Sequence, residues 1–368
     1  MTNTRIPAAP KDVGRLSLVL ASAIAATRGE PNPLSFGKVK SSVVVMVDGL
    51  GLQNLEAFKG HAPHLMKLQS ANSRSIRSEC PSTTVLGLVS LASGLRAGLH
   101  GLIGYNVVKA GDTKITNLLS GWEQNKANPA DWKTYQTLSE TNLITVVSPS
   151  AYERSGFTQL TMPSAQFIGA ETIDERLRIA SKIAEGKGTV TYVYIPELDQ
   201  AGHRFGCASD AWISKLEELN SALLKTSFPS GCGLVLTADH GMVDIDESNH
   251  LFIDSFESLS GIEFVTGGDT RCAYLYLQQT EASEMVISRL EAELGSGVAV
   301  CTWSDLVESG WQIRPDKYDL VPNIVLVAIG AVAFYDRRTA KPASMRMVGH
   351  HGSVSDQETR IPLITQGF

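Results

Sequence analysis

Cysteine is scarce in this sequence, and the few cysteines present are not arranged as a disulfide framework. The 368-residue chain holds five, which lie far apart, include no Cys-x-x-Cys pair and are odd in number. This pattern is typical of unpaired thiols in a reducing compartment rather than of a disulfide-stapled secreted domain.

Long hydrophobic runs are also lacking. The longest one near the amino terminus covers residues 16–26 and is too short to span a bilayer. Arg15 precedes this run and small residues follow it, so residues 1–27 could form a signal peptide, but Asp12 lies where a basic flank would be expected. We therefore expect a cytoplasmic protein that does not associate with membranes, with export as the alternative.

The sequence has no excess of basic residues, no internal repeat and no low-complexity tract. Lys and Arg number 32 against 38 Asp and Glu, a net charge of −6, which argues against binding of a nucleic-acid polymer. Hydrophobic residues make up 43% and charged residues 19%, so a sizeable core can form. The length favours two domains, or one large domain with an insertion.

Short apolar runs alternate with helical patterns along the chain. Because the runs show no polar alternation, they suit strands buried on both faces of a mostly parallel sheet. These runs are residues 42–47, 143–147, 190–195, 234–237 and 324–328. The helical segments are about 10–27, ended by Gly29 and Pro31, then 173–185, and 211–225 capped by Ser209 or Asp210. Strand–helix alternation predicts a layered α/β fold with helices flanking the central sheet.

Residues 244–343 differ from the rest of the chain. They contain short candidate strands at 261–265, 273–277 and 298–301 and one amphipathic helix at 281–294. We interpret this stretch as a small α+β cap inserted into a core made of residues 1–243 and 344–368.

Acidic residues and histidines gather in four short segments, three of them directly after a predicted strand. The segments are Asp48-Gly-Leu-Gly51, Glu197-Leu-Asp199-Gln-Ala-Gly-His203, Asp239-His240-Gly and Gly-His350-His351-Gly352. In an open parallel sheet the carboxyl ends of the strands share one edge, where ligands bind. Each segment alone also fits a turn, a helix cap or a solvated i,i+4 pair. Together, about three Asp and three His suit two divalent transition metals, and we expect zinc.

A hydroxyl group for catalysis could come from the segment Cys80-Pro-Ser82-Thr83-Thr84, which begins a small-residue, helix-like run that ends at Gly94. The amino terminus of a helix offers free backbone N–H groups and the positive end of the helix dipole. That position favours both a bound phosphate and an ionised hydroxyl. Ser82 or Thr83 could equally be the helix N-cap.

Taken together, these segments resemble the alkaline phosphatase superfamily, and most closely its nucleotide pyrophosphatase/phosphodiesterase branch. The resemblance covers residues 43 to 352 in the order of the family motifs, including the step from Gly94 to His100-Gly101. It implies hydrolysis of a small phosphoester or nucleotide by a hydroxyl nucleophile and two metal ions.

The resemblance also assigns roles to individual residues. In the family the nucleophile lies ten residues before the glycine of a Thr/Ser-Gly step, here Gly94, which selects Thr84 over Thr83. The late His-Gly step selects His351 over His350. One zinc ion would be held by Asp199, His203 and His351. The other would be held by Asp48, Asp239 and His240, with Thr84 as a further ligand.

The match to the family pattern is incomplete at the phosphate-binding groups. Members often have an Asn shortly after the His-Gly step, and the nearest candidates here are Tyr105 and Asn106, the latter displaced by one residue. No motif locates the arginine that monoesterases use, so a phosphomonoesterase or phosphonate hydrolase stays an alternative to a diesterase. The segment that begins at Cys80 lacks the arginine signature of sulfatases, which argues against a sulfatase. A metal-dependent mutase commonly uses Ser as its nucleophile, so Thr84 argues against a mutase. A non-catalytic binding domain would be expected to lose ligand residues, yet all six are present.

Overall fold

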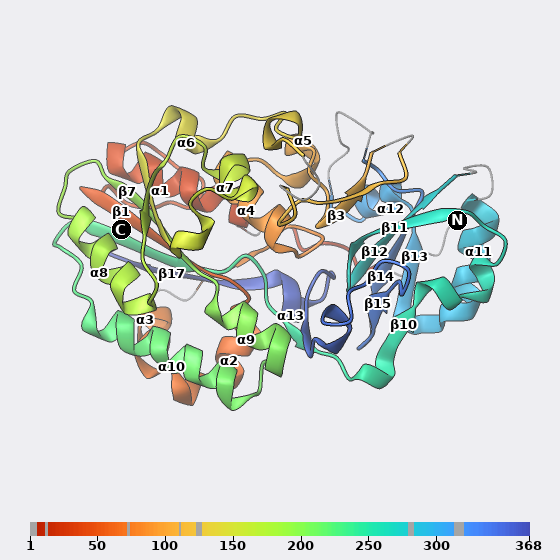
Figure 1. Ribbon diagram of the computed structural model, residues 1–368. Helices are drawn as coiled ribbons and strands as arrows, with labels where there is room; N and C mark the ends of the chain where they lie inside the picture. The colour runs from red at the N-terminus through yellow and green to blue at the C-terminus, as the bar shows by residue number, and fades with distance from the viewer. Residues whose placement is uncertain are drawn as a thin grey trace.

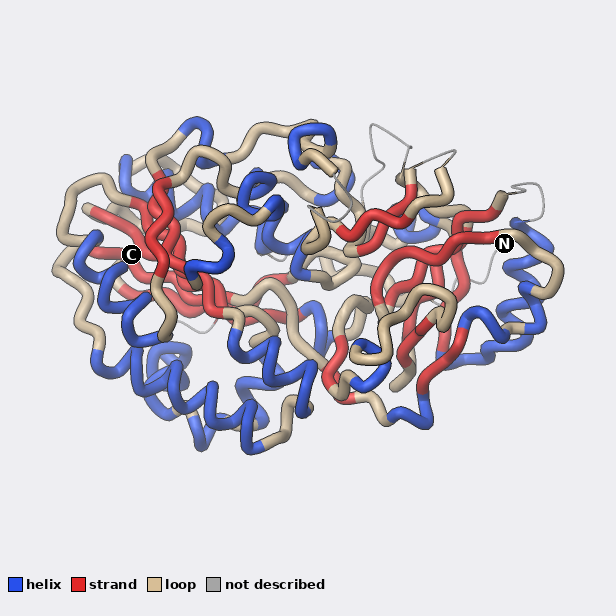
Figure 2. The backbone as a smooth tube through the Cα atoms, in the orientation of Figure 1, coloured by secondary structure: helices blue, strands red, loops and turns tan. Residues whose placement is uncertain are grey.

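Two β-sheets organise the molecule, each in its own lobe. The computed structural model describes residues 6–11, 14–71, 74–109, 112–122, 127–278, 283–312 and 320–368. Figure 1 shows the larger lobe, with most of the helices, beside a smaller lobe built around the second sheet. Figure 2 shows the strands as two separate blocks joined by loops.

The sheet of the larger lobe is mostly parallel, as the apolar runs predict. It has seven strands in the order β2-β17-β8-β1-β7-β5-β6, and β1 pairs in parallel with both β7 and β8. β17 pairs antiparallel with β8 and β2. The strands are β1 Ser41–Val47, β2 Arg74–Arg77, β5 Ile144–Ser148, β6 Gln166–Gly169, β7 Val190–Ile195, β8 Cys232–Thr237 and β17 Arg360–Gln366. All seven residues of β1 are buried, as expected for a central strand covered on both faces.

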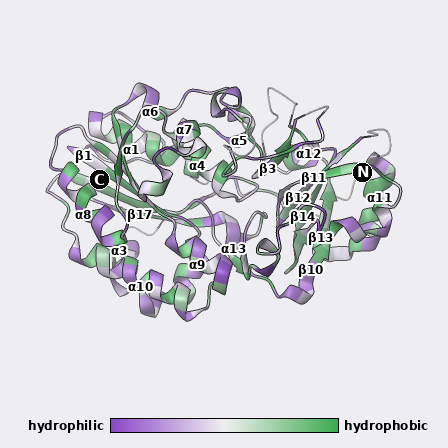
Figure 3. Ribbon diagram, in the orientation of Figure 1, coloured by the Kyte–Doolittle hydropathy of each residue, from purple (hydrophilic) through white to green (hydrophobic). Residues whose placement is uncertain are grey.

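Helices cover both faces of this sheet, which confirms the predicted α/β class. One group contains α2, α3, α8, α9 and α10, and the other contains α1, α4, α6 and α7 (Figure 1). Their bounds are α1 Val19–Arg28, α2 Leu52–Ala57, α3 Pro63–Ala71, α4 Thr84–Ser93, α5 Ala97–His100, α6 Leu138–Thr141, α7 Gly156–Thr161, α8 Ile173–Ile183, α9 Glu197–Phe205, α10 Asp210–Lys225 and α13 Asp356–Thr359. In Figure 3 the strands of both lobes are the most hydrophobic segments, whereas the outer helices carry polar stripes.

The helix predicted to begin at about Pro10 begins later. A short 3-10 turn at Leu16–Leu18 precedes α1, because Arg15 is extended and forms a β-bridge with Arg77. α1 ends as expected at Gly29, which adopts a left-handed conformation with φ of 72°. The other two predicted helices are present. Ser209 caps α10 by accepting a hydrogen bond from the Trp212 N–H.

The second sheet is antiparallel and has six strands in the order β13-β14-β12-β11-β3-β4. The strands are β3 Asn106–Val108, β4 Ile115–Asn117, β11 Phe264–Asp269, β12 Cys272–Leu277, β13 Val298–Cys301 and β14 Ile324–Ala328. Helices α11 Ser283–Leu294 and α12 Trp303–Glu308 belong to the same lobe. The predicted first residue of α11, Glu281, lies outside the described residues. The strand predicted at 261–265 lies further along the chain, as β11.

The prediction that the run at 324–328 belongs to the parallel sheet is wrong. It forms β14, which lies antiparallel between β12 and β13 in the second sheet. All five residues of β14 are buried. An unbroken apolar run indicates burial on both faces and carries no information about strand direction.

Segments outside 244–343 also contribute to the smaller lobe. β3 and β4, from residues 106–117, extend its sheet next to β11. Two short strand pairs lie near the junction of the lobes: β10 His250–Phe252 with β15 Ala333–Tyr335, and β9 Val243–Asp244 with β16 Gly349–His350. None of the described helices is both long and apolar enough to cross a membrane.

Candidate active site

Three adjacent parallel strands bring the Asp and His segments to one edge of the main sheet. Asp48 directly follows β1, α9 with Asp199 and His203 follows β7, and the Asp239-His240 pair follows β8. His351 follows β16, whose partner β9 lies just beyond the Asp239-His240 loop. The six predicted metal ligands therefore come together although they span most of the chain.

Asp48, Asp239 and His240 form the first group. Asp48 Oδ1 lies 3.3 Å from His240 Nε2, and Asp239 Oδ2 lies 3.5 Å from the same nitrogen. All three side chains are buried. One donor atom from each lies within 4.8 Å of the others, which is close enough for a shared metal ion.

Asp199, His203 and His351 form the second group. Asp199 Oδ1 is 3.3 Å from His203 Nε2 and 3.8 Å from His351 Nε2, and the two Nε2 atoms are 3.3 Å apart. His240 also lies within 4.8 Å of Asp199 and His351, and its ring stacks on His351 at 3.7 Å between centroids. His240 thus lies between the two groups.

Backbone carbonyls fix which nitrogen each histidine presents to the centre. His203 Nδ1 is 2.8 Å from Gly349 O, His351 Nδ1 is 2.9 Å from Ser82 O, and His240 Nδ1 is 3.3 Å from Gly241 O. A carbonyl oxygen only accepts, so each Nδ1 carries the proton and each Nε2 has a free lone pair. This arrangement is usual for metal-binding histidines, whose outer nitrogen is held by a second hydrogen bond.

Each of the three carboxylates has one oxygen without a hydrogen-bond partner. Asp48 Oδ1, Asp199 Oδ1 and Asp239 Oδ2 are buried without a hydrogen-bond partner. Burial raises the pKa of Asp48 and Asp199, and burial followed by repulsion from Asp199 raises the pKa of Asp239 to about 7. Burial lowers the pKa of His240 to about 3. Buried carboxylates and neutral imidazoles aimed at one point fit divalent cations, which would supply the missing positive charge.

The start of α4 separates the two candidate hydroxyl groups. Thr83 is the N-cap, and its Oγ1 accepts from the Leu86 N–H at 3.5 Å. Thr84 is the first helical residue, and its Oγ1 lies 3.2 Å from His240 Nε2. Ser82 points elsewhere: its hydroxyl donates to Ser353 O and accepts from Gly352 N–H, which ties the start of α4 to the segment after His351.

A cavity of about 710 Å³ opens above these groups, between the two lobes. Its lining includes Thr84, Asp199, His203 and His351 together with both predicted phosphate-binding candidates, Tyr105 and Asn106. The smaller lobe contributes β11 and the segment from Phe334 to Met347. Among the described residues that line the cavity, Lys341 is the single basic side chain of the Lys or Arg type. Arginine is thus absent from this described lining.

Several residues outside the motifs contact the candidate metal-binding residues, their loops or the cavity. The Tyr194 hydroxyl donates to Asp48 Oδ2, which leaves Oδ1 facing His240. Asn54 on α2 holds the loop after His240, because its amide bonds both the N–H and the carbonyl of Met242. Asp269, at the end of β11, adds a carboxylate to the cavity, and burial raises its pKa to about 7. None of these residues stands in a recognisable motif, since their partners are remote in sequence.

His350 faces away from the two metal groups. Its Nδ1 lies 3.1 Å from Thr270 Oγ1 and its Nε2 lies 3.2 Å from Met347 O, so both nitrogens have partners. The structure therefore brings His351, and not its neighbour, into the candidate centre.

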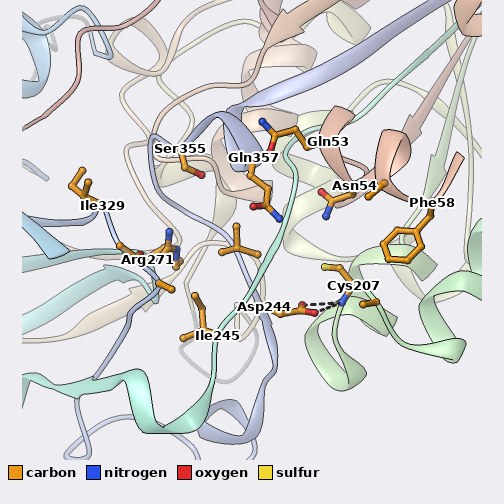
Figure 4. A pocket seen from close by; sticks show the side chains of 15 residues that line it. Gln53, Asn54, Phe58, Cys207, Asp244, Ile245, Arg271, Ile329, Ser355 and Gln357 are labelled. Atoms are coloured by element: carbon orange, nitrogen blue, oxygen red, sulfur yellow. Dashed lines mark hydrogen bonds between the residues drawn. The ribbon is translucent and has the colours of Figure 1, made fainter.

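A second cavity, of about 500 Å³, contains none of the candidate ligands. Figure 4 shows that Asn54 and Gln357 reach toward each other there and that Asp244 bonds the Cys207 backbone. Arg271, also in its lining, is paired with Glu358. The polar groups of this cavity are thus largely engaged within the protein.

The molecule has an alkaline phosphatase-like α/β fold, with the Asp and His cluster at the carboxyl edge of its main sheet. Residues 42–354 match the model of the type I phosphodiesterase / nucleotide pyrophosphatase family. The chain belongs to that family, whose enzymes hydrolyse phosphoester bonds.

Similar proteins agree with this assignment. Venom phosphodiesterase of Naja atra is 25% identical over 217 residues, which make up 54% of this chain. The match spans 26% of the length of the snake protein, about a quarter of that relative. Murine ectonucleotide pyrophosphatase / phosphodiesterase 5 has the same fold, with a TM-score of 0.66, 15% identity and coverage of 88% of this chain and 87% of that one. Phosphonoacetate hydrolase from Sinorhizobium meliloti 1021, solved with phosphonoacetate, also has a TM-score of 0.66 and 15% identity, covering 89% of this chain and 90% of that one.

Proposed function

We propose that the protein is a metal-dependent phosphodiesterase or nucleotide pyrophosphatase that uses Thr84 as nucleophile and two divalent metal ions, which we assign as zinc. The observation that carries the proposal is the pair of ligand groups with unpartnered carboxylate oxygens beside a threonine hydroxyl at a helix amino terminus. Family membership agrees with this reaction class.

The contacts support the proposed ligand set. Asp199, His203 and His351 would hold one ion, and Asp48, Asp239 and His240 would hold the other, with Thr84 Oγ1 next to the second group. When bound, two such ions supply positive charge at the attacking and leaving oxygens of an in-line displacement. Imidazole and carboxylate donors in this ratio suit zinc, and they also accept manganese or iron.

The position of Thr84 supports its proposed role as the nucleophile. Its hydroxyl lies at the first position of α4, where free backbone N–H groups and the helix dipole favour negative charge on both the hydroxyl oxygen and the phosphoryl group. A bond would form between Thr84 Oγ1 and phosphorus while the bond to the alcohol or nucleotide breaks. Water would then release the phosphoryl group and restore the threonine. Positioning and charge supply most of the acceleration in phosphoryl transfer.

The cavity favours a small phosphoester or nucleotide over a nucleic-acid polymer. Its volume of about 710 Å³ lies in the range of small-molecule sites. The lack of an arginine among its described lining residues favours a singly charged diester over a monoester dianion. A phosphonate hydrolase is the second candidate, since Lys341 could pair with a second anionic group of such a substrate.

A substrate screen in the presence of zinc or manganese tests the proposal. The panel contains p-nitrophenyl phosphate, bis-p-nitrophenyl phosphate, the p-nitrophenyl ester of thymidine 5′-monophosphate, and phosphonoacetate. We expect the two diesters to be cleaved fastest and Thr84→Ala to abolish cleavage. Metal-loaded, folded protein that cleaves none of them at a rate above Thr84→Ala would contradict the proposed function.

A further inference from the structure

Two asparagines face each other at the edge of the smaller lobe that lines the catalytic cavity. Asn106 begins β3 and Asn117 ends β4, and they are directly paired in the antiparallel register. Both line the cavity that contains Thr84. The hydrogen bonds of Asn117 determine how the amide of Asn106 is oriented.

The side-chain oxygen of Asn117 is saturated by donors from the following turn. It accepts from the Leu119 N–H at 3.1 Å, from the Ser120 N–H at 2.7 Å and from the Ser120 hydroxyl at 3.3 Å. Backbone N–H groups can only donate, so the atom that meets them must be the oxygen and not the nitrogen of the amide. The amide of Asn117 therefore has one allowed orientation.

This orientation is passed on to Asn106. Asn117 Nδ2 donates to Asn106 Oδ1 at 3.0 Å. Because Asn106 Oδ1 is engaged in this way, the amide of Asn106 keeps its Nδ2 as the group available to a ligand. Among the described residues no side chain or backbone carbonyl accepts a hydrogen bond from Asn106 Nδ2.

The backbone that carries Asn106 is held from the other side as well. Asn106 pairs with Gly268 on β11, so β3 lies between β4 and β11. At Gly267 a Cβ atom would come within 2.7 Å of Asn106 O, so the strands approach each other closely there. Asn106 thus has both its backbone and its side-chain oxygen fixed.

We propose that Asn117 is a positioning residue that holds the Asn106 amide so that Nδ2 donates a hydrogen bond to a non-bridging phosphoryl oxygen of the substrate. This inference rests on the proposed function of the Thr84 site. A donor held before the substrate arrives stabilises the charge that develops on that oxygen without reorganisation. A neutral amide donor also matches the single negative charge of a phosphodiester, whereas a dianionic monoester is better served by arginine.

Asn117→Asp tests the inference because it preserves shape and reverses hydrogen bonding. An Asp side chain still accepts from Leu119 and Ser120, so the turn should be retained. It cannot donate to Asn106 Oδ1, and instead accepts from Asn106 Nδ2, which turns the Asn106 oxygen toward the substrate. We expect kcat/KM for a diester to fall by roughly 10²-fold, with metal content and Tm close to wild type.

An uncharged variant separates orientation from charge. In Asn117→Ala the Asn106 amide is free to adopt either orientation, so we expect a loss smaller than that of Asn117→Asp. Ser120→Ala is the matched control, because Asn117 keeps its two backbone donors. Its kcat/KM should stay within about 3-fold of wild type if the two remaining bonds hold the amide.

A double-mutant cycle with Asn106→Ala decides whether Asn117 acts through Asn106. If it does, Asn117→Asp causes no further loss of kcat/KM in the Asn106→Ala background. Wild-type activity in Asn117→Asp, or the same fold-loss in both backgrounds, would overturn the inference.

Binding of inorganic phosphate to the zinc-loaded protein, measured by calorimetry, provides a second and independent test. The positioning role is supported, even if the substrate screen fails, by two results together. Asn117→Asp should bind phosphate more weakly than wild type, and the same substitution should cause no further weakening in the Asn106→Ala background. Equal phosphate affinity of Asn117→Asp and wild type contradicts the positioning role.

Discussion

Thr83 and Thr84 are neighbours with the same functional group, yet the start of α4 gives them different surroundings. Thr83 has an extended backbone and bonds the N–H of Leu86, whereas Thr84 lies within reach of His240. Successive helical residues point about 100° apart, so only one of the two hydroxyls can face the ligand cluster. Position, and not chemistry, distinguishes the nucleophile from the cap.

Alanine substitutions should separate these roles. Thr84→Ala removes a group that acts in the transition state, so kcat and kcat/KM should fall together by on the order of 10³-fold or more. Thr83→Ala removes a cap and should cost roughly 1 kcal/mol of stability with activity largely kept. Thr84→Ser should retain appreciable activity. Steady-state kinetics and thermal denaturation of all three variants test this. Inactive Thr83→Ala beside active Thr84→Ala would show that the assignment is off by one residue.

His100 illustrates a buried histidine that serves the fold and not the metals. It is fully buried, its Nδ1 accepts from the Leu102 N–H at 3.2 Å, and its Nε2 lies 2.9 Å from the Ser90 hydroxyl. These bonds require the neutral ring with its proton on Nε2. Burial lowers the pKa of His100 to about 3.

This lowered pKa predicts a contribution to acid unfolding. The unfolded state takes up a proton near pH 6.5, a typical value for histidine, and the folded state does not do so until about pH 3. Stability is therefore lost as the pH falls from about 6.5 toward 3. In His100→Gln the unfolded state has no such proton to bind, so the fall in Tm between pH 7 and pH 4 should be shallower. The comparison uses chelator-treated protein to remove metal effects. Identical slopes for wild type and variant would refute this role.

At the scale of elements, α4 is packed against the ligand loop through a glycine. A Cβ at Gly87 would come within 2.8 Å of Asp239 Cβ. An alanine in the middle of a helix normally stabilises it by about 1 kcal/mol relative to glycine. Here the added methyl group must push α4, and Thr84 with it, away from Asp239.

Gly87→Ala should therefore lower activity although it raises helix propensity. A displacement of a few tenths of an ångström at the nucleophile should reduce kcat by about 10-fold or more. Gly60→Ala is a suitable control, since its Cβ would meet no atom within 4 Å. Wild-type kcat and an increased Tm in Gly87→Ala would show that α4 can shift without affecting the site.

The elements that could be predicted from sequence are those whose apolar pattern is local. β1, β7, β8, α8 and α10 follow from runs of residues that are buried as a unit. Strand direction and pairing are not encoded locally, so the apolar pattern of β14 does not show to which sheet it belongs. β3 and β4 have three residues each and join the sheet through the pairing of β3 with β11, so no pattern of their own marks them.

The same distinction applies to the site. Asp48, Asp239 and His240 could be proposed because each lies within a few residues of the end of a buried strand. Tyr194 and Asn117 could not, since they act through partners that are brought near only by sheet pairing and loop packing. The roles of the predicted metal ligands and of Thr84 stay predictions, although the structure brings these side chains together.

At the scale of the whole molecule, the candidate ligands connect distant parts of the chain. They lie between Asp48 and His351 and come from the ends of three core strands and from the segment after β16. An unfolded chain cannot present these groups together, so metal binding should favour the folded state strongly. The cost of gathering buried carboxylates without a counterion falls on the metal-free protein.

We therefore expect the purified protein to bind close to two divalent metal ions per chain and to depend on them for stability. A free metal concentration about 100 times the dissociation constant stabilises the folded state by roughly 2.7 kcal/mol per site. Chelation should lower Tm by several degrees, and zinc should restore it.

Asp239→Ala should remove at least one ion and much of this change in Tm. Asp239→Asn is the matched variant, because it keeps an oxygen for the N–H groups of Gly49 and His240 while losing the charge. Thr84→Ala keeps both groups of Asp and His ligands and should bind nearly as much metal as wild type. Metal content by elemental analysis and Tm by calorimetry measure these effects. Folded protein that binds almost no zinc after reconstitution, or Asp239→Asn that binds as much as wild type, would exclude this site as a two-metal centre.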